Sequence, residues 1–217
     1  PTPATTGKAV AIDTLNAHNF DQTGLGFIRG GFVSVASGGT GPIALSRTLA
    51  PGVPRWGAEY KQWLREHTGT VAGVTMLFDV MPYEHNFLDL DPKKVDRNGV
   101  PVIRITYRFG ENEEKASAYF TKKMEEIVEA AGAEQVWSFG AVPYPLFSHA
   151  YGGTRMGDDP SKSVVDKYGR AHEIPNLFVL GASTHASSSG YNPTETVFAH
   201  SWYAADYIAE NFTEIGV

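Results

Sequence analysis

Residues 176–195 read N-L-F-V-L-G-A-S-T-H-A-S-S-S-G-Y-N-P-T-E and combine three local signals. The apolar run 176–181, closed by glycine, is typical of a fully buried parallel strand. A loop of small residues follows, and Asn192 then begins a helix as its N-cap, with Pro193 at the first helical position and Glu195 at the third. A strand, a small-residue loop and a capped helix form the βα element on which nucleotide cofactors lie in doubly wound folds. The stretch therefore predicts part of an α/β cofactor-binding domain.

A second motif lies upstream, where S-H-A-Y-G-G-T-R-M-G spans residues 148–157. Gly152 and Gly153 allow a tight turn or a close approach of the backbone to a ligand. A polar side chain beside small residues in each motif makes His149 and Asn192 the candidate site groups. Two alternatives stay open here: His149 as a hydrogen-bonded structural histidine, and Asn192 as a helix cap only.

Together these motifs resemble the C-terminal signature of the glucose–methanol–choline (GMC) flavoprotein oxidoreductases. The resemblance rests on H-x-x-G-G-T-R-M-G-x-D-P, S-V-V-D, N-L-F-V-L-G-A-S and G-Y-N-P-T-x-T-V. It is greatest for the gluconate 2-dehydrogenase and bacterial sugar dehydrogenase branch. The family's glycine-rich FAD motif, near the N-terminus of a chain more than twice this long, is absent here. The resemblance therefore implies the C-terminal portion of a longer enzyme.

The resemblance also implies a cofactor, site residues and partners. FAD would be the cofactor, His149 the base and Asn192 the group that orients the substrate oxygen. The cofactor-binding residues would be Gly181, Ala182, Asn192, Pro193 and Thr194. The substrate would be a sugar, a sugar acid or a polyol. Partners would be the N-terminal FAD-binding portion of the same enzyme and a cytochrome or small electron-transfer subunit, in the periplasm or at the membrane of a bacterium.

The first 145 residues predict a different architecture from the rest. Strands are expected at 32–35, 71–81, 87–90 and 100–108, with hairpin-like spacing. An amphipathic helix is expected over 113–131, ended by Gly132. We therefore predict an α+β substrate-binding domain over 1–145, with an antiparallel sheet covered by one helix. Residues 146–217 are then the C-terminal strand–helix part of an α/β FAD-binding domain.

Composition excludes several other classes of protein. A net charge of −6 argues against nucleic acid as the main partner, and the absence of cysteine excludes disulfides and thiolate metal sites. No H-x-x-x-H or H-E-x-x-H pair supports a metal site. A serine hydrolase is the rival from another class of enzyme, but no G-x-S-x-G turn occurs.

The leading hypothesis makes two further predictions. The side chains of His149 and Asn192 should meet at one substrate oxygen. The 217 residues alone should neither retain FAD nor oxidise alcohols, because the first βα turn of the cofactor site is missing. The alternatives are a catalytically incomplete substrate-domain fragment and a flavin sugar oxidase that uses oxygen.

Overall fold

A computed structural model describes residues 11–12, 15, 18–36, 45–46, 48–141 and 149–215. The chain divides into two compact units: a first unit of residues 1–78 and 115–141, and a second unit of residues 79–114 and 142–217. The elements in chain order are β1 (Ala11–Ile12), β2 (Gly31–Ala36), α2 (Gly57–His67), β3 (Gly73–Phe78), β4 (Phe87–Val95), β5 (Pro101–Thr106), α3 (Glu111–Ala130), the 3₁₀ turn η3 (Ala182–Thr184) and α4 (Thr194–Glu210). The predicted domain boundary at 145 lies outside the described residues, and the assignment of the two domains stays a prediction.

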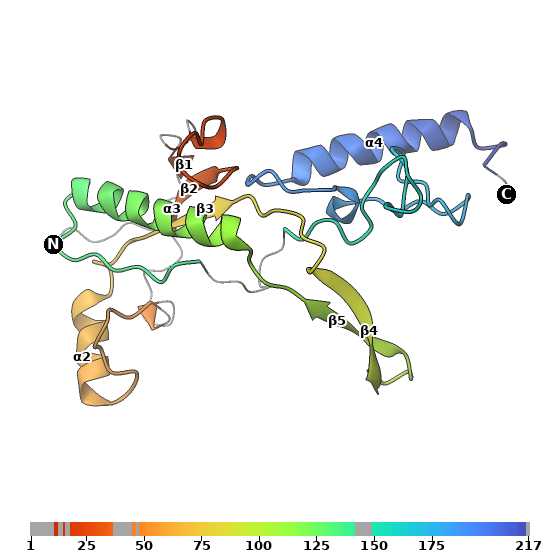
Figure 1. The fold of residues 1–217 in the computed structure, drawn as a ribbon. Helices are drawn as coiled ribbons and strands as arrows, with labels where there is room; N and C mark the ends of the chain where they lie inside the picture. Colours follow the sequence, from red (N-terminus) through yellow and green to blue (C-terminus); the bar gives the residue numbers. More distant parts are fainter. Residues whose placement is uncertain are drawn as a thin grey trace. The chain divides into compact units, whose positions relative to one another are not determined.

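The first unit is an antiparallel sheet covered by a helix (Figure 1). Its strands lie in the order β1-β2-β3, and Val33 of β2 pairs with Met76 of β3. From α3, Ala116 and Phe120 pack onto Val33, with the Phe27 ring 5.5 Å from the Phe120 ring between centroids. The expected α+β arrangement of an antiparallel sheet and one covering helix is confirmed for this unit.

Helix α3 confirms the predicted 113–131 helix, with a start two residues earlier. It ends at Ala130, and Gly132 takes the expected C′ position with a φ of 90°, the left-handed conformation that favours glycine. The Ala133 N–H donates to Val128 O at 3.1 Å and the Gly132 N–H to Glu129 O at 2.9 Å. These two bonds are the Schellman pattern that satisfies the last carbonyls of a helix.

Strands β4 and β5 do not join the sheet under α3, so the prediction that the strands at 87–90 and 100–108 belong to the same sheet as 32–35 and 71–81 is wrong. They form a separate two-stranded antiparallel hairpin within the second unit. The break follows β3, where Pro82 has no N–H to donate to a neighbouring strand. The Met81 N–H donates instead to the buried carboxylate of Glu113 at 2.9 Å.

The predicted buried parallel strand over 176–181 is also wrong. Phe178 makes an isolated antiparallel bridge to Arg170, and Leu177 and Leu180 are exposed. A buried parallel strand needs parallel neighbours for its backbone groups. In the described part of the chain every named strand pairs antiparallel, so 176–181 has no such neighbour.

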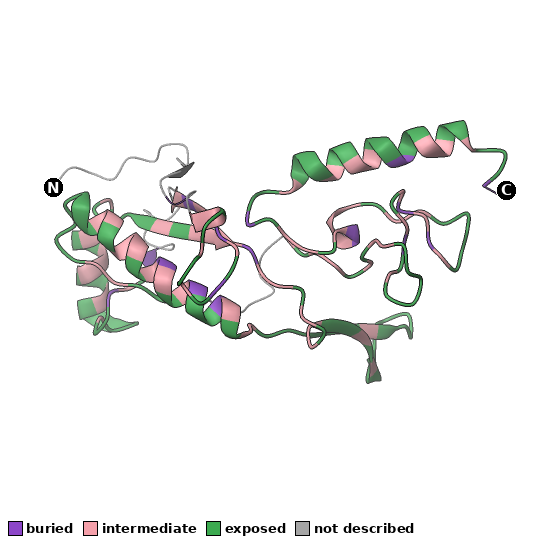
Figure 2. Ribbon diagram, turned by 45° about the horizontal axis from the view of Figure 1, so that its top comes forward, coloured by how far each residue is buried: buried purple, intermediate pink, exposed green. Residues whose placement is uncertain are grey.

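Helix α4 packs one side of its surface within the second unit and exposes the other (Figure 2). Ala204 is fully buried, and the Tyr207 ring stacks on Tyr168 with centroids 3.8 Å apart. Phe198 and Trp202 on the opposite side are 69% and 73% exposed. Among the described helices, none has the length and apolar character needed to cross a membrane.

Candidate functional site

The two sequence motifs lie side by side in the second unit. The Thr154 N–H donates to Ser183 O at 2.9 Å, and the Met156 N–H donates to Thr184 O at 2.7 Å. The Thr154 hydroxyl also donates to Ser183 Oγ at 2.8 Å. The glycine-rich segment 152–157 is therefore hydrogen-bonded to 181–185 through Thr154 and Met156, although almost thirty residues separate the two segments in the chain.

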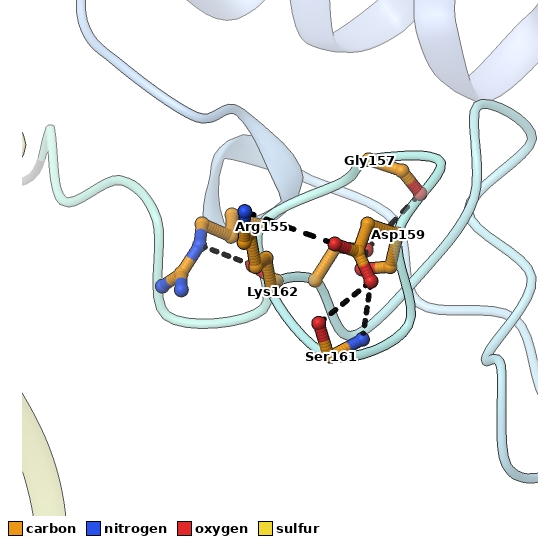
Figure 3. Close-up of polar contacts among 6 residues, drawn as sticks. Arg155, Gly157, Asp159, Ser161 and Lys162 are labelled. Carbon is orange, nitrogen blue, oxygen red and sulfur yellow. Dashed lines mark hydrogen bonds and ion pairs between the residues drawn. The ribbon is translucent and has the colours of Figure 1, made fainter.

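A polar loop that contains Asp159, Ser161 and Lys162 contacts the 152–157 segment at Arg155 (Figure 3). Arg155 Nε donates to Lys162 O at 2.7 Å, and Asp159 Oδ1 accepts the Ser161 N–H at 2.9 Å. The hydrogen bonds from Ser161 lower the pKa of Asp159. The Gly157 N–H then donates to O of Val165, which is fully buried. The loop holds the motif through the backbone oxygens of Lys162 and Val165. The side chains of Arg155 and Asp159 have hydrogen-bond partners within the chain, so their positions are explained without a ligand.

Gly181 has a backbone that only glycine adopts readily. Its φ of 114° and ψ of −178° lie outside the regions open to other residues, and it leads directly into η3. A Cβ built on Gly181 would meet no atom within 4 Å. The space beside Gly181 is therefore open, and the assignment of Gly181 and Ala182 to the cofactor stays a prediction.

The start of α4 differs from the prediction. The helix begins at Thr194, Pro193 occupies the N-cap position, and no side chain caps it. The prediction of Asn192 as N-cap is therefore wrong, because proline at the cap position moves the helix start by one residue. Asn192 is exposed and is not engaged by the helix that follows it.

His149 lies at the edge of the described residues, directly after the gap at 142–148, and is half-buried. It belongs to the same compact unit as Asn192. Among the described residues no hydrogen bond joins the two side chains. Their convergence on one substrate oxygen stays a prediction.

A group of aromatic residues that sequence reasoning did not select lies beside the motif junction. The Tyr151 ring is 6.0 Å from the His185 ring between centroids, and the His185 ring is 6.2 Å from the His200 ring. Burial, with a smaller contribution from His200, lowers the pKa of His185. Burial, with a smaller contribution from the Asp79 carboxylate, raises the pKa of Tyr151. Neither His185 nor His200 belongs to a motif that predicts a role, and Tyr151 falls on an x position of H-x-x-G-G-T-R-M-G, so no local signal marks the group.

The other histidine of this region is structural. His172 Nε2 lies 3.1 Å from Gly157 O and 3.0 Å from Ser163 Oγ. In the part of the chain that the structure describes, no group of three or more histidine or acidic side chains is placed to hold a metal ion.

The chain belongs to the GMC oxidoreductase family, whose C-terminal domain matches residues 82–201. That match contains both motifs and the hairpin of β4 and β5. The family's members are flavoproteins, so FAD is the expected cofactor.

Three relatives match most of the chain. The gluconate 2-dehydrogenase flavoprotein of Pantoea cypripedii is 32% identical over 95% of this chain and 34% of its own length. The 2-methyl-1,2-propanediol dehydrogenase of Mycolicibacterium austroafricanum is 32% identical over 93% of this chain and 37% of its own length. The fructose dehydrogenase large subunit of Gluconobacter japonicus is 33% identical over 73% of this chain and 29% of its own length. The chain thus spans about a third of the length of the relatives it matches.

Proposed function

We propose that this chain is the C-terminal portion of an FAD-dependent dehydrogenase that oxidises an alcohol of a sugar, a sugar acid or a polyol. The observation that carries the proposal is the hydrogen-bonded junction between 152–157 and 181–185, at 2.7 to 2.9 Å. It joins the motif that holds His149 to the motif that leads to Asn192. The names of the relatives refer to gluconate, 2-methyl-1,2-propanediol and fructose. Each of these compounds has an alcohol beside a second oxygen-bearing carbon.

The residues assigned to the cofactor fit a large ligand that approaches the backbone closely. The space beside Gly181 is open, and Ala182 next to it is small and half-buried. The start of α4, at Pro193 and Thr194, has no side-chain cap. The first N–H groups of a helix and its dipole favour negative charge or hydrogen-bond acceptors. We assign the flavin end of FAD to these residues.

The chemistry divides between cofactor and protein. Bound FAD would accept the hydride from the alcohol carbon. His149 would take the hydroxyl proton, because a neutral imidazole is a suitable base near neutral pH. Asn192 would donate its amide N–H to the same oxygen and hold the carbon in position, which contributes to rate through alignment. Asn192 is available for this role because the helix does not use it as a cap.

The length of the chain leads to the second half of the proposal. Because the relatives are about three times longer, we propose that other parts of a longer protein complete the FAD site. Residues 1–145 would then contribute to substrate binding and 146–217 to the flavin side. A relative named as a large subunit supports at least one further subunit as partner. We propose that this partner is a cytochrome or small electron-transfer subunit.

The mechanism is tested by stopped-flow measurement of flavin reduction in the complete protein, with D-gluconate, D-fructose and 2-methyl-1,2-propanediol as substrates. His149→Ala should slow reduction by roughly 10²- to 10⁴-fold, the usual contribution of a general base. Asn192→Ala should also slow it, since alignment is lost. His67→Ala, the same change in α2 of the first unit, is the control and should have no effect. An unchanged rate in His149→Ala would remove this residue from the mechanism.

The incompleteness of the site is tested on the 217 residues alone. Purified and mixed with FAD, they should retain none after gel filtration, whereas the complete protein should remain yellow. Tight FAD binding by the 217 residues would contradict this part of the proposal and leave the mechanism intact.

A further inference from the structure

The rings of Tyr151, His185 and His200 are in successive contact in the second unit, and we call them the Tyr–His–His cluster. His185 stands between the other two, tilted by 36° against Tyr151 and by 71° against His200. It lies directly after η3, where its N–H donates to Ala182 O at 3.1 Å. The cluster is therefore attached to the same segment as the flavin-side residues of the proposed function.

The cluster contains two buried polar atoms that have no hydrogen-bond partner among the described residues. One is the Tyr151 hydroxyl oxygen and the other is His200 Nδ1. Buried polar atoms in folded proteins are nearly always paired, because leaving one unpaired costs the free energy of its desolvation. Two such atoms beside one histidine indicate that a ligand or solvent molecule completes the cluster.

The chemistry of the two atoms selects the kind of group that fits. The raised pKa keeps the Tyr151 hydroxyl protonated, so it can donate a hydrogen bond. His200 Nε2 lies 3.1 Å from Lys167 O, and a carbonyl only accepts, so Nε2 carries the proton. In the neutral ring, His200 Nδ1 is then an acceptor. The Tyr151 hydroxyl both donates and accepts, so a hydroxyl group of a ligand suits it as a partner.

The position of Tyr151 relates the cluster to the reacting alcohol. Two residues after His149, its backbone lies within about 7 Å of that histidine, the reach of two extended residues. Gly152 then turns the chain with a φ of 79°. Its turn is close to His185, since a Cβ on Gly152 would be 3.7 Å from His185 O. Tyr151 is thus close in the chain to the proposed base, and its ring contacts His185, the residue directly after η3.

We infer that the Tyr–His–His cluster binds a second hydroxyl of the substrate, beside the alcohol that is oxidised. This inference rests on the proposed function and specifies its substrate class as alcohols with a neighbouring hydroxyl. Tyr151 is the residue that recognises this hydroxyl, and the rings of His185 and His200 complete the cluster beside it.

The experiment compares 2-methyl-1,2-propanediol with 2-methyl-1-propanol in the complete flavoprotein, because these alcohols differ only in the second hydroxyl. The wild-type protein should half-saturate at a lower concentration of the diol. Tyr151→Phe, which removes one oxygen and keeps the ring, should raise the half-saturating diol concentration by about 3- to 10-fold. It should leave the value for the mono-alcohol and the limiting rate of flavin reduction unchanged. Tyr60→Phe in α2 is the matched control.

Calorimetric titration with both alcohols measures binding whether or not the flavin is reduced. Equal binding of the diol by wild-type and Tyr151→Phe proteins would overturn the inference and show that the cluster holds water only. Equal binding of the two alcohols by the wild-type protein would overturn it as well. Loss of flavin reduction in His149→Ala, together with either result, would leave the proposed function standing.

Discussion

The two units of this chain bury their apolar side chains to very different degrees. In the first unit, Phe27, Val33 and Phe120 are almost completely buried in one core. In the second unit, Leu90 and Ile103 on the hairpin are 60% and 68% exposed. Paired across β4 and β5, together with Leu88 and Ile105, they form an aliphatic face that the described chain leaves open.

Polar contacts hold the second unit together in place of a large core. Its fully or nearly buried apolar residues, among those described, are Val165, Ala171, Ala204 and Ile215. The Ser188 hydroxyl donates to the buried carboxylate of Asp79, and the Val80 N–H donates to Ser188 Oγ at 3.3 Å. These bonds tie the serine-rich loop to the segment after β3. A unit built this way is what we expect of part of a larger domain, in line with the proposed incompleteness of the chain.

The sharpest test of this contrast is to remove one phenylalanine from each unit. Phe120→Ala should reduce the free energy of unfolding by about 3–5 kcal/mol, since it leaves a cavity in a closed core. Phe198→Ala in α4 should change it by less than about 0.5 kcal/mol, because this side chain is 69% exposed. Urea unfolding of the 217 residues, followed by tryptophan fluorescence, measures both. Similar losses in the two variants would mean that the units are packed alike.

Glu113 tests how far the second unit depends on polar bonds. Its carboxylate is buried and accepts the Met81 and Gly110 N–H groups, each at 2.9 Å. Glu113→Ala should cost about 2–4 kcal/mol of unfolding free energy, since it leaves two backbone donors unpaired. Glu114→Ala, a neighbouring change at an exposed position, should be nearly neutral. Equal stability of the two variants in urea would contradict the importance of this buried carboxylate.

A substitution at Gly181 tests the backbone conformation of the segment to which we assign the flavin end of FAD. Gly181→Ala should cost about 1–3 kcal/mol, because a φ of 114° is strained for alanine even though space is open beside it. Gly153→Ala is the matched control: its φ is not in the left-handed region, and the new Cβ would meet Leu88 Cδ1 at an ordinary 3.5 Å. Thermal unfolding compares the two. A neutral Gly181→Ala would show that the turn adjusts without strain.

The smallest expected effect is a pH dependence that comes from His185. Its pKa is lowered on folding, so the unfolded chain binds the proton more tightly. The stability contribution is fully present above the ordinary value of 6.5 and is lost as the pH falls through the lowered folded pKa. The titratable groups against His185 are His200 and Tyr151. His185→Gln should therefore flatten the fall in urea midpoint between pH 7 and 5, and an unchanged slope would exclude His185 as a cause.

Local patterns in the sequence determined much of the secondary structure. The apolar stripe of α3 and the glycine after it specify a helix and its end, since both depend on residues within one or two turns. The strands β2, β3 and β5 fell within or close to their predicted ranges, because alternation of apolar residues is a local property. The family was identifiable for the same reason, from motifs that are contiguous in the chain.

Tertiary contacts decided what the local patterns left open. An apolar run such as 176–181 suits a parallel strand, but only a neighbouring parallel strand makes it one. Asn192 suits a helix cap, yet the helix began one residue later and left the side chain exposed. The Tyr–His–His cluster joins residues that are far apart in the chain, and the unpaired atoms of Tyr151 and His200 appear only once their surroundings are folded. Burial and pairing are properties of neighbours in space, and a single sequence does not specify those neighbours.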